Sequence, residues 1–154
     1  MSDTLRVEID PPDKGGMTLA LSAGDQHFRD NFTFATSRFL LPLVEAMRLL
    51  QEGTFVDEKL WLLLGAPTLD IRIHSEVGDR DASLRVEFWP DSRRSKLTKA
   101  PILFAYSSPR REMVLAFVSA LRKLRASAGD PALATKYGAW FPLTEYDRLL
   151  AVVE

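Results

Sequence analysis

The stretch Leu69–Phe88, which reads LDIRIHSEVGDRDASLRVEF, decides the fold class of this chain. Apolar and polar residues alternate on both sides of its Gly-Asp-Arg-Asp centre, and this two-residue period is typical of strands with one buried face. The short centre predicts a hairpin loop, so the two strands are expected to pair antiparallel. In a regular register their outward faces coincide, and opposite charges on them form a cross-strand ladder. The residues of that predicted face are Asp70, Arg72, His74, Glu76, Arg85, Glu87 and Trp89.

The same period recurs upstream of this hairpin. Alternating apolar residues over 5–9, 17–23 and 28–34 predict an antiparallel meander, and a further strand is expected over 102–106. The apolar run Leu60–Leu64 fits either a short buried helix or a strand by its pattern. We interpret it as a helical turn before Gly65.

Four stretches are expected to be helical. From Ser37 the apolar residues follow a helical stripe, and Gly53 suits the C-terminal cap of that helix. Ser108 and Pro109 are expected as the N-cap and first-turn proline of a long helix that continues to residue 125. A short helix is expected over 130–138, and Thr144 resembles the start of a capping box for a last helix that ends near residue 153.

These elements predict a single α+β domain over residues 1–154. Its antiparallel sheet is expected to have about five to six strands in strand-strand-helix blocks, with the helices packed on one face. A content of 46% hydrophobic and 27% charged residues is typical of a soluble globular protein and argues against wholesale disorder.

The chain contains no cysteine, which excludes a disulfide framework, a thiolate zinc site and a cysteine nucleophile. Residues 1–10 show no signal-peptide pattern, and the run Leu60–Leu64 is far shorter than a membrane helix. We therefore expect a cytoplasmic protein without a membrane-spanning segment.

Charge is unevenly distributed along the chain. The segment from Arg93 to Arg125 holds nine basic residues and one acidic residue, Glu112, and so carries +8 in a chain of net charge −1. Such a segment can face an anionic partner, spread over a solvated surface, or be neutralised within the fold. Sequence order leaves these readings open.

No motif of the sequence identifies an enzyme class. Glycine-rich nucleotide loops and the G-x-S-x-G nucleophile motif are absent from it. Asp25, His27 and Asp30 combine residue types used in acid–base and metal chemistry, so an enzyme of unknown reaction that uses these three residues is one alternative. Because their spacing fixes no third strong metal ligand, we predict neither a metal nor a cofactor.

The best candidate for function is Trp89 with the polar, basic stretch that follows it. Aromatic and arginine residues are the usual anchors of protein interfaces. We therefore predict a small, non-catalytic interaction protein of the adaptor, inhibitor or immunity-protein type, which binds a protein partner. The predicted partner-binding residues are Trp89, Arg93, Arg94, Lys96, Arg110 and Arg111.

An anion-binding protein is the other alternative, with nucleic acid or a phosphorylated ligand as its partner. It would use Arg93, Arg94, Lys96, Lys99, Arg110 and Arg111. The sequence pI of about 6.1 argues against nucleic acid. An exposed sheet face or edge also leaves a homodimer open.

Overall fold

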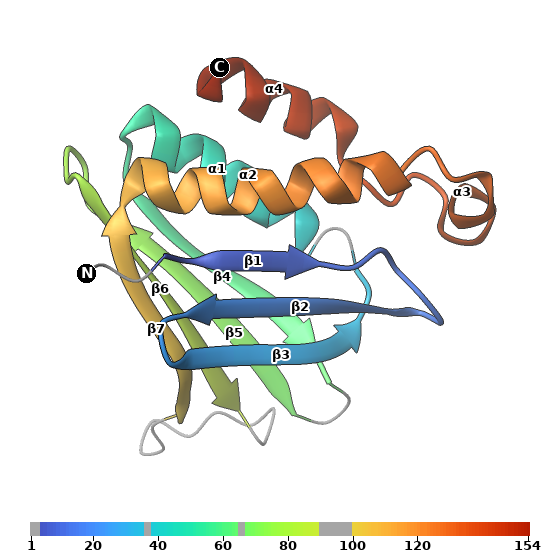
Figure 1. Ribbon diagram of the computed structural model, residues 1–154, viewed down its shortest axis with the longest axis horizontal. Helices are drawn as coiled ribbons and strands as arrows, with labels where there is room; N and C mark the ends of the chain where they lie inside the picture. The colour runs from blue at the N-terminus through green and yellow to red at the C-terminus, as the bar shows by residue number, and fades with distance from the viewer. Residues whose placement is uncertain (1–3, 36–37, 65–66, 90–99) are drawn as a thin grey trace.

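The computed structural model describes residues 4–35, 38–64, 67–89 and 100–154 (Figure 1). Within these ranges seven strands form an open antiparallel sheet in chain order, and four helices complete an α+β fold. The strands are β1 (Arg6–Ile9), β2 (Gly16–Ala23), β3 (Gln26–Thr33), β4 (Val56–Leu63), β5 (Thr68–Ser75), β6 (Asp81–Trp89) and β7 (Ile102–Pro109). The helices are α1 (Leu40–Glu52), α2 (Arg110–Ser127), α3 (Pro131–Tyr137) and α4 (Leu143–Val153).

The sheet bends sharply between β3 and β4. Among the described residues, these strands are joined in register at Thr33 and Leu63 alone, whereas the later strands pair along most of their length. Figure 1 shows β1–β3 crossing in front of β4–β7. The side chain of Gln26 connects the two layers again, because its amide donates to the carbonyl of Ala105 at 2.8 Å and accepts from the Ala105 N–H at 3.0 Å. This contact covers part of the edge of β7, which would otherwise be open to strand pairing.

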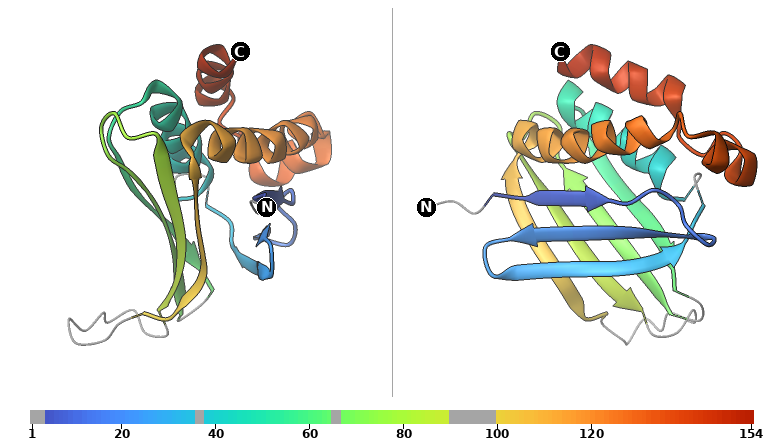
Figure 2. Two further views of the ribbon diagram at one scale, coloured as in Figure 1. Left: turned by 60° about the vertical axis from the view of Figure 1, so that its left-hand side comes forward. Right: turned by 45° about the vertical axis from the view of Figure 1, so that its right-hand side comes forward.

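The hydrophobic core lies between the two layers and below the helices. The apolar positions of the alternating strands turn inward in both layers and join the buried stripes of α1 and α2 in a continuous cluster. In Figure 2, α1 and α2 lie over one end of the layers, and α4 packs on α1. With its apolar positions turned inward, the β4–β7 layer presents its charged positions on the opposite face.

The predicted α+β class and antiparallel sheet are confirmed, but the predicted strand count and block pattern are wrong. The described residues contain seven strands, arranged as three strands, a helix, four strands and further helices. The main error is β4, because Leu60–Leu64 was expected to be a helical turn. The strand alternation is masked there, since Glu58 occupies an inward position and Trp61 an outward one.

One helix-cap prediction is confirmed and two are wrong. Gly53 ends α1 with a φ of 77°, a left-handed conformation that favours glycine. The short helix expected over 130–138 is present as α3, which Asp130 caps through the N–H of Ala132 at 2.9 Å. Ser108 does not cap α2, because β7 continues through the next residue. Thr144 does not cap α4, which begins one residue earlier. In the described residues no helix is long and apolar enough to cross a membrane.

Candidate functional site

The outward side of β4–β7, here called the outer face, is organised in rows across the strands. Register partners in an antiparallel sheet point to the same side, so each row follows from the pairing. The basic row is Lys59, Arg72 and Arg85. The acidic row beside it is Asp70 and Glu87, with Trp61 and Ile102 at its two ends. The third row, on the other side of the basic row, is Asp57, His74, Ser83 and Ser107.

The acidic row is buried, whereas the basic row is half exposed. The side chains of Asp70 and Glu87 are 0% and 10% exposed, compared with 38%, 39% and 44% for Lys59, Arg72 and Arg85. Positive charge therefore reaches the surface while the compensating carboxylates lie beneath it.

The Glu87 carboxylate holds two arginines of the basic row together. Arg72 Nε donates to Glu87 Oε1 at 2.9 Å, and Arg85 Nη2 lies 2.9 Å from Glu87 Oε2. Like charges directly opposite each other destabilise a sheet, and the shared carboxylate offsets that repulsion. Of the predicted cross-strand ladder of opposite charges, the described residues of β5 and β6 show the diagonal pair Arg72–Glu87, whereas the residues directly opposite each other carry like charges.

Exposed apolar side chains border these charges. Trp61 is 44% exposed and Ile102 is 55% exposed, although both belong to types that are usually buried. The Nζ atom of Lys59 lies 5.9 Å from the centroid of the Trp61 ring, within cation–π range. Trp89 is half-buried and pairs in register with Thr68, beyond the acidic row.

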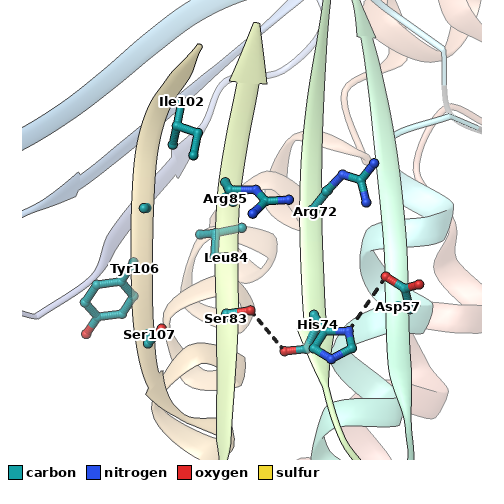
Figure 3. Close-up of a pocket in the computed structure, with 10 residues that line it drawn as sticks. Asp57, Arg72, His74, Ser83, Leu84, Arg85, Ile102, Tyr106 and Ser107 are labelled. Atoms are coloured by element: carbon teal, nitrogen blue, oxygen red, sulfur yellow. Dashed lines mark hydrogen bonds and ion pairs between the residues drawn. The ribbon is translucent and has the colours of Figure 1, made fainter. Parts of the chain in front are cut away.

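The third row brings Asp57, His74 and Ser83 together, but in a geometry unlike that of a catalytic triad (Figure 3). Asp57 Oδ1 lies 3.7 Å from His74 Nδ1, while His74 Nε2 lies 3.0 Å from a carboxylate oxygen of Glu76. The Ser83 hydroxyl donates to the backbone carbonyl of His74 at 3.5 Å. A nucleophilic serine needs the imidazole nitrogen as its base, and here that nitrogen faces a carboxylate.

A shallow pocket of about 470 Å³ lies on the outer face, between the basic row and the third row (Figure 3). Arg72 and Arg85 line it from β5 and β6. Ser83 and Ser107 contribute hydroxyl groups, and Ile102 supplies apolar surface from β7. Because the Ser83 hydroxyl donates to the His74 carbonyl, the donors left for an oxygen anion are the guanidinium groups and the Ser107 hydroxyl.

A second groove lies beside β4 and is lined by Arg38, Pro42, Glu58, Lys59 and Trp61. Burial raises the pKa of the Glu58 carboxyl above its ordinary value, and the nearby carboxylates of Asp57 and Glu45 raise it further. The ionised form of Glu58 is therefore less favourable in the folded protein than in water.

Those predicted partner-binding residues that the structure describes lie apart. Arg93, Arg94 and Lys96 lie outside the described residues, as does Lys99 of the anion-binding alternative. Trp89 lies on the outer face at the end of β6, near the start of β7. Arg111 is exposed in the first turn of α2, after the far end of β7, and a strand of that length spans roughly 23 Å. The structure does not bring Trp89 and Arg111 together.

Arg110 is buried and serves the fold. Its Nε donates to the carbonyl of Asp79 at 2.6 Å, its Nη1 to those of Thr54 at 2.8 Å and Leu50 at 3.3 Å, and its Nη2 to that of Glu76. The guanidinium thus sits at the C-terminal end of α1, where the helix dipole favours a cation. We therefore leave Arg110 out of any contact surface.

The alternative site at Asp25, His27 and Asp30 is spread over β3 and the turn before it. His27 and Asp30 are three residues apart in the strand, so their side chains point to opposite faces. In the described parts of the chain, no group of three or more His, Asp or Glu residues could hold a metal ion.

Sequence reasoning placed Arg72 and Arg85 on the outer face but missed Lys59 and Trp61. These two residues depend on β4, which was not recognised as a strand. The available signal was the placement of Val56, Leu60 and Leu62 at positions of the same parity, which lie on one side of a strand. No protein-family model, curated protein or solved structure matches the chain.

Proposed function

We propose that this chain is a non-catalytic recognition protein that binds a protein partner through its outer face. The observation that carries the proposal is the half-exposed basic row beside buried carboxylates, with Trp61 and Ile102 at the ends of the acidic row. Arginine and large aromatic side chains are enriched in interface hot spots. An exposed cationic row also attracts and orients a partner of opposite charge. We therefore expect the partner to present acidic residues next to apolar ones.

The proposed contact residues differ in part from those expected from sequence. Trp89 remains, and Arg93, Arg94 and Lys96 follow it in the chain and remain in the proposal. The outer face adds Lys59, Trp61, Arg72, Arg85 and Ile102. This composition suits a small adaptor, inhibitor or immunity-type protein.

The test is a capture experiment from native host lysate with three tagged baits: wild type, Trp61→Ala and Leu143→Ala. Trp61 and Leu143 are both 44% exposed, but Leu143 lies on α4, so it is a matched control. We expect a nuclease-resistant protein that wild type and Leu143→Ala retain equally. Trp61→Ala should reduce its affinity about tenfold or more, because interface tryptophans are often hot spots.

Equal melting temperatures of the three baits would show that the loss is not due to unfolding. Equal capture by all three baits would overturn the proposal. Nuclease-sensitive recovery of nucleic acid would also overturn it and would favour the anion-binding alternative.

A further inference from the structure

We infer that the pocket on the outer face binds a single carboxylate, from an Asp or Glu side chain of the partner, between Arg72 and Arg85. This inference rests on the proposed function, because it specifies which chemical group of the partner the outer face recognises. Both arginines line the pocket, and Figure 3 shows them on the neighbouring strands β6 and β5, with the Arg85 side chain extended toward β5 and the Arg72 side chain toward β4.

The two arginines have donors suited to a second carboxylate. A guanidinium carries five N–H donors in a fixed plane, and the contact with Glu87 uses Nε of Arg72 and Nη2 of Arg85. Their half-exposed side chains need little displacement of other protein groups to accept a ligand. Arginine pairs with carboxylates through short, charge-assisted hydrogen bonds, often in bidentate geometry.

The local charge favours one negative charge over two. The two arginines carry two positive charges, which the carboxylates of Glu87 and Asp57 balance, so the site has no positive excess to hold a dianion. Asp57 also lines the pocket, and its carboxylate would repel a further anion. Asp57 and Glu76 both flank His74 at the margin of the pocket. A carboxylate therefore fits this site better than a phosphate dianion.

The remaining lining can accommodate an acidic side chain. Ser107 offers a hydroxyl group from the third row, while Ile102 offers apolar surface to the methylene groups of an acidic residue. The pocket is a trough on an open sheet face, so the rest of a bound segment would extend over the neighbouring rows toward Trp61.

The site is tested by following the arginine Nε–H signals of the full-length protein by NMR during titration with N-acetylglutamate N-methylamide. This probe has one side-chain carboxylate and no other charge. We expect saturable shifts at Arg72 and Arg85 with a dissociation constant of about 1–10 mM, the range for a single small contact. The neutral glutamine analogue should cause no such shifts, and N-acetyl-O-phosphoserine N-methylamide should bind more weakly.

Three variants are expected to change the affinity for the carboxylate probe in three different ways. Arg72→Gln should weaken binding of the carboxylate probe about fivefold or more, read at Arg85. Glu87→Gln should strengthen it, because this change removes the internal carboxylate that competes for the same arginines. Arg29→Gln, at an exposed arginine of β3, should leave it unchanged. A general loss of structure cannot produce this pattern, since one variant gains affinity.

Unsaturable shifts, or equal shifts with the glutamine analogue, would overturn the inference. So would weaker binding in Glu87→Gln, and so would phosphoserine binding more tightly than glutamate. The proposed function has a separate readout, which is partner capture that depends on Trp61. If that dependence is found while the carboxylate probe does not bind the pocket, the protein interface is kept and the carboxylate site is rejected.

Discussion

Arginine has two contrasting environments in this molecule. Arg110 is 6% exposed and donates to backbone carbonyls from the end of α1 and from the β5–β6 loop. Arg72 and Arg85 are about two-fifths exposed and share one carboxylate. The first arginine joins segments that are far apart in the sequence, while the other two present positive charge at the surface. Burial and the nature of the acceptor therefore determine whether an arginine holds the fold or faces a partner.

A segment dense in basic residues is expected to present its charges to a partner, and the arginines of this molecule show the reverse. Arg110 belongs to the strongly basic segment 93–125, yet its donors are directed into the fold. Arg72 and Arg85 lie outside that segment, in strands where acidic and basic residues are mixed. Another cation of the basic segment, Arg122, lies 2.6 Å from a carboxylate oxygen of Glu154. The number of basic residues in segment 93–125 is therefore larger than the number of positive charges that the segment has available for a partner.

The largest expected effect comes from Arg110→Met, which keeps an unbranched apolar stem but removes every donor. The carbonyls of Leu50 and Glu76 keep the backbone N–H donors of Gly53 and Asp79. The carbonyls of Thr54 and Asp79 lose the Arg110 donor, and each such loss costs up to about 1–3 kcal/mol, less where water can enter. We expect a loss of about 3 kcal/mol in the free energy of unfolding, or a fall in Tm of roughly 6–12 °C. Thermal unfolding followed by circular dichroism measures it.

Arg111→Met is the matched control, because Arg111 is the next residue of α2 and is exposed. Its Tm should stay close to that of wild type, since exposed substitutions usually change stability by less than about 0.5 kcal/mol. Equal losses in the two variants would mean that α2 loses stability for a reason other than the hydrogen bonds of Arg110.

A smaller effect is expected from Arg72→Gln, which tests whether the half-exposed arginines contribute less to stability than Arg110 does. Arg72 is half exposed and its partner Glu87 keeps Arg85, so the free energy of unfolding should fall by at most about 1 kcal/mol. Urea unfolding at low and high salt measures this, and the difference from wild type should shrink at high salt. A loss as large as that of Arg110→Met would show that the outer face supports the fold more than it serves recognition.

The strands could be predicted wherever the two-residue period is clean. The β5–β6 hairpin and its outward charges follow from alternation, and the register confirms them. β4 was missed because Glu58 interrupts its apolar side. The role of Arg110 could not be read from sequence, since its acceptors lie 31–60 residues away and are backbone groups that any residue carries. Lys59 and Trp61 were missing from the predicted outer face, because both residues lie on β4.

The smallest expected effect is a gain in stability and concerns Glu58, the charged residue that interrupts the apolar side of β4. Its folded-state pKa is raised above the ordinary value of 4.5 by burial and by the carboxylates of Asp57 and Glu45. The folded protein therefore binds the Glu58 proton more tightly than the unfolded chain does, and stability falls as pH rises from about 4.5 through the folded-state pKa. Glu58→Gln removes this loss, so its Tm should exceed that of wild type at pH 7.

The pH dependence separates this cause from simple repacking. As the pH falls below 4.5 the Glu58 carboxyl becomes protonated in both states, so the advantage of Glu58→Gln should shrink and then disappear. In an Asp57→Asn background the advantage at pH 7 should be smaller, because one of the repelling carboxylates is gone. A gain that persisted unchanged at pH 4 would contradict the electrostatic cause. The cost of Glu58 would then come from the packing of its side chain on β4 and not from its charge. Among the arginines, by contrast, the environments differ in burial and in the hydrogen-bond acceptor.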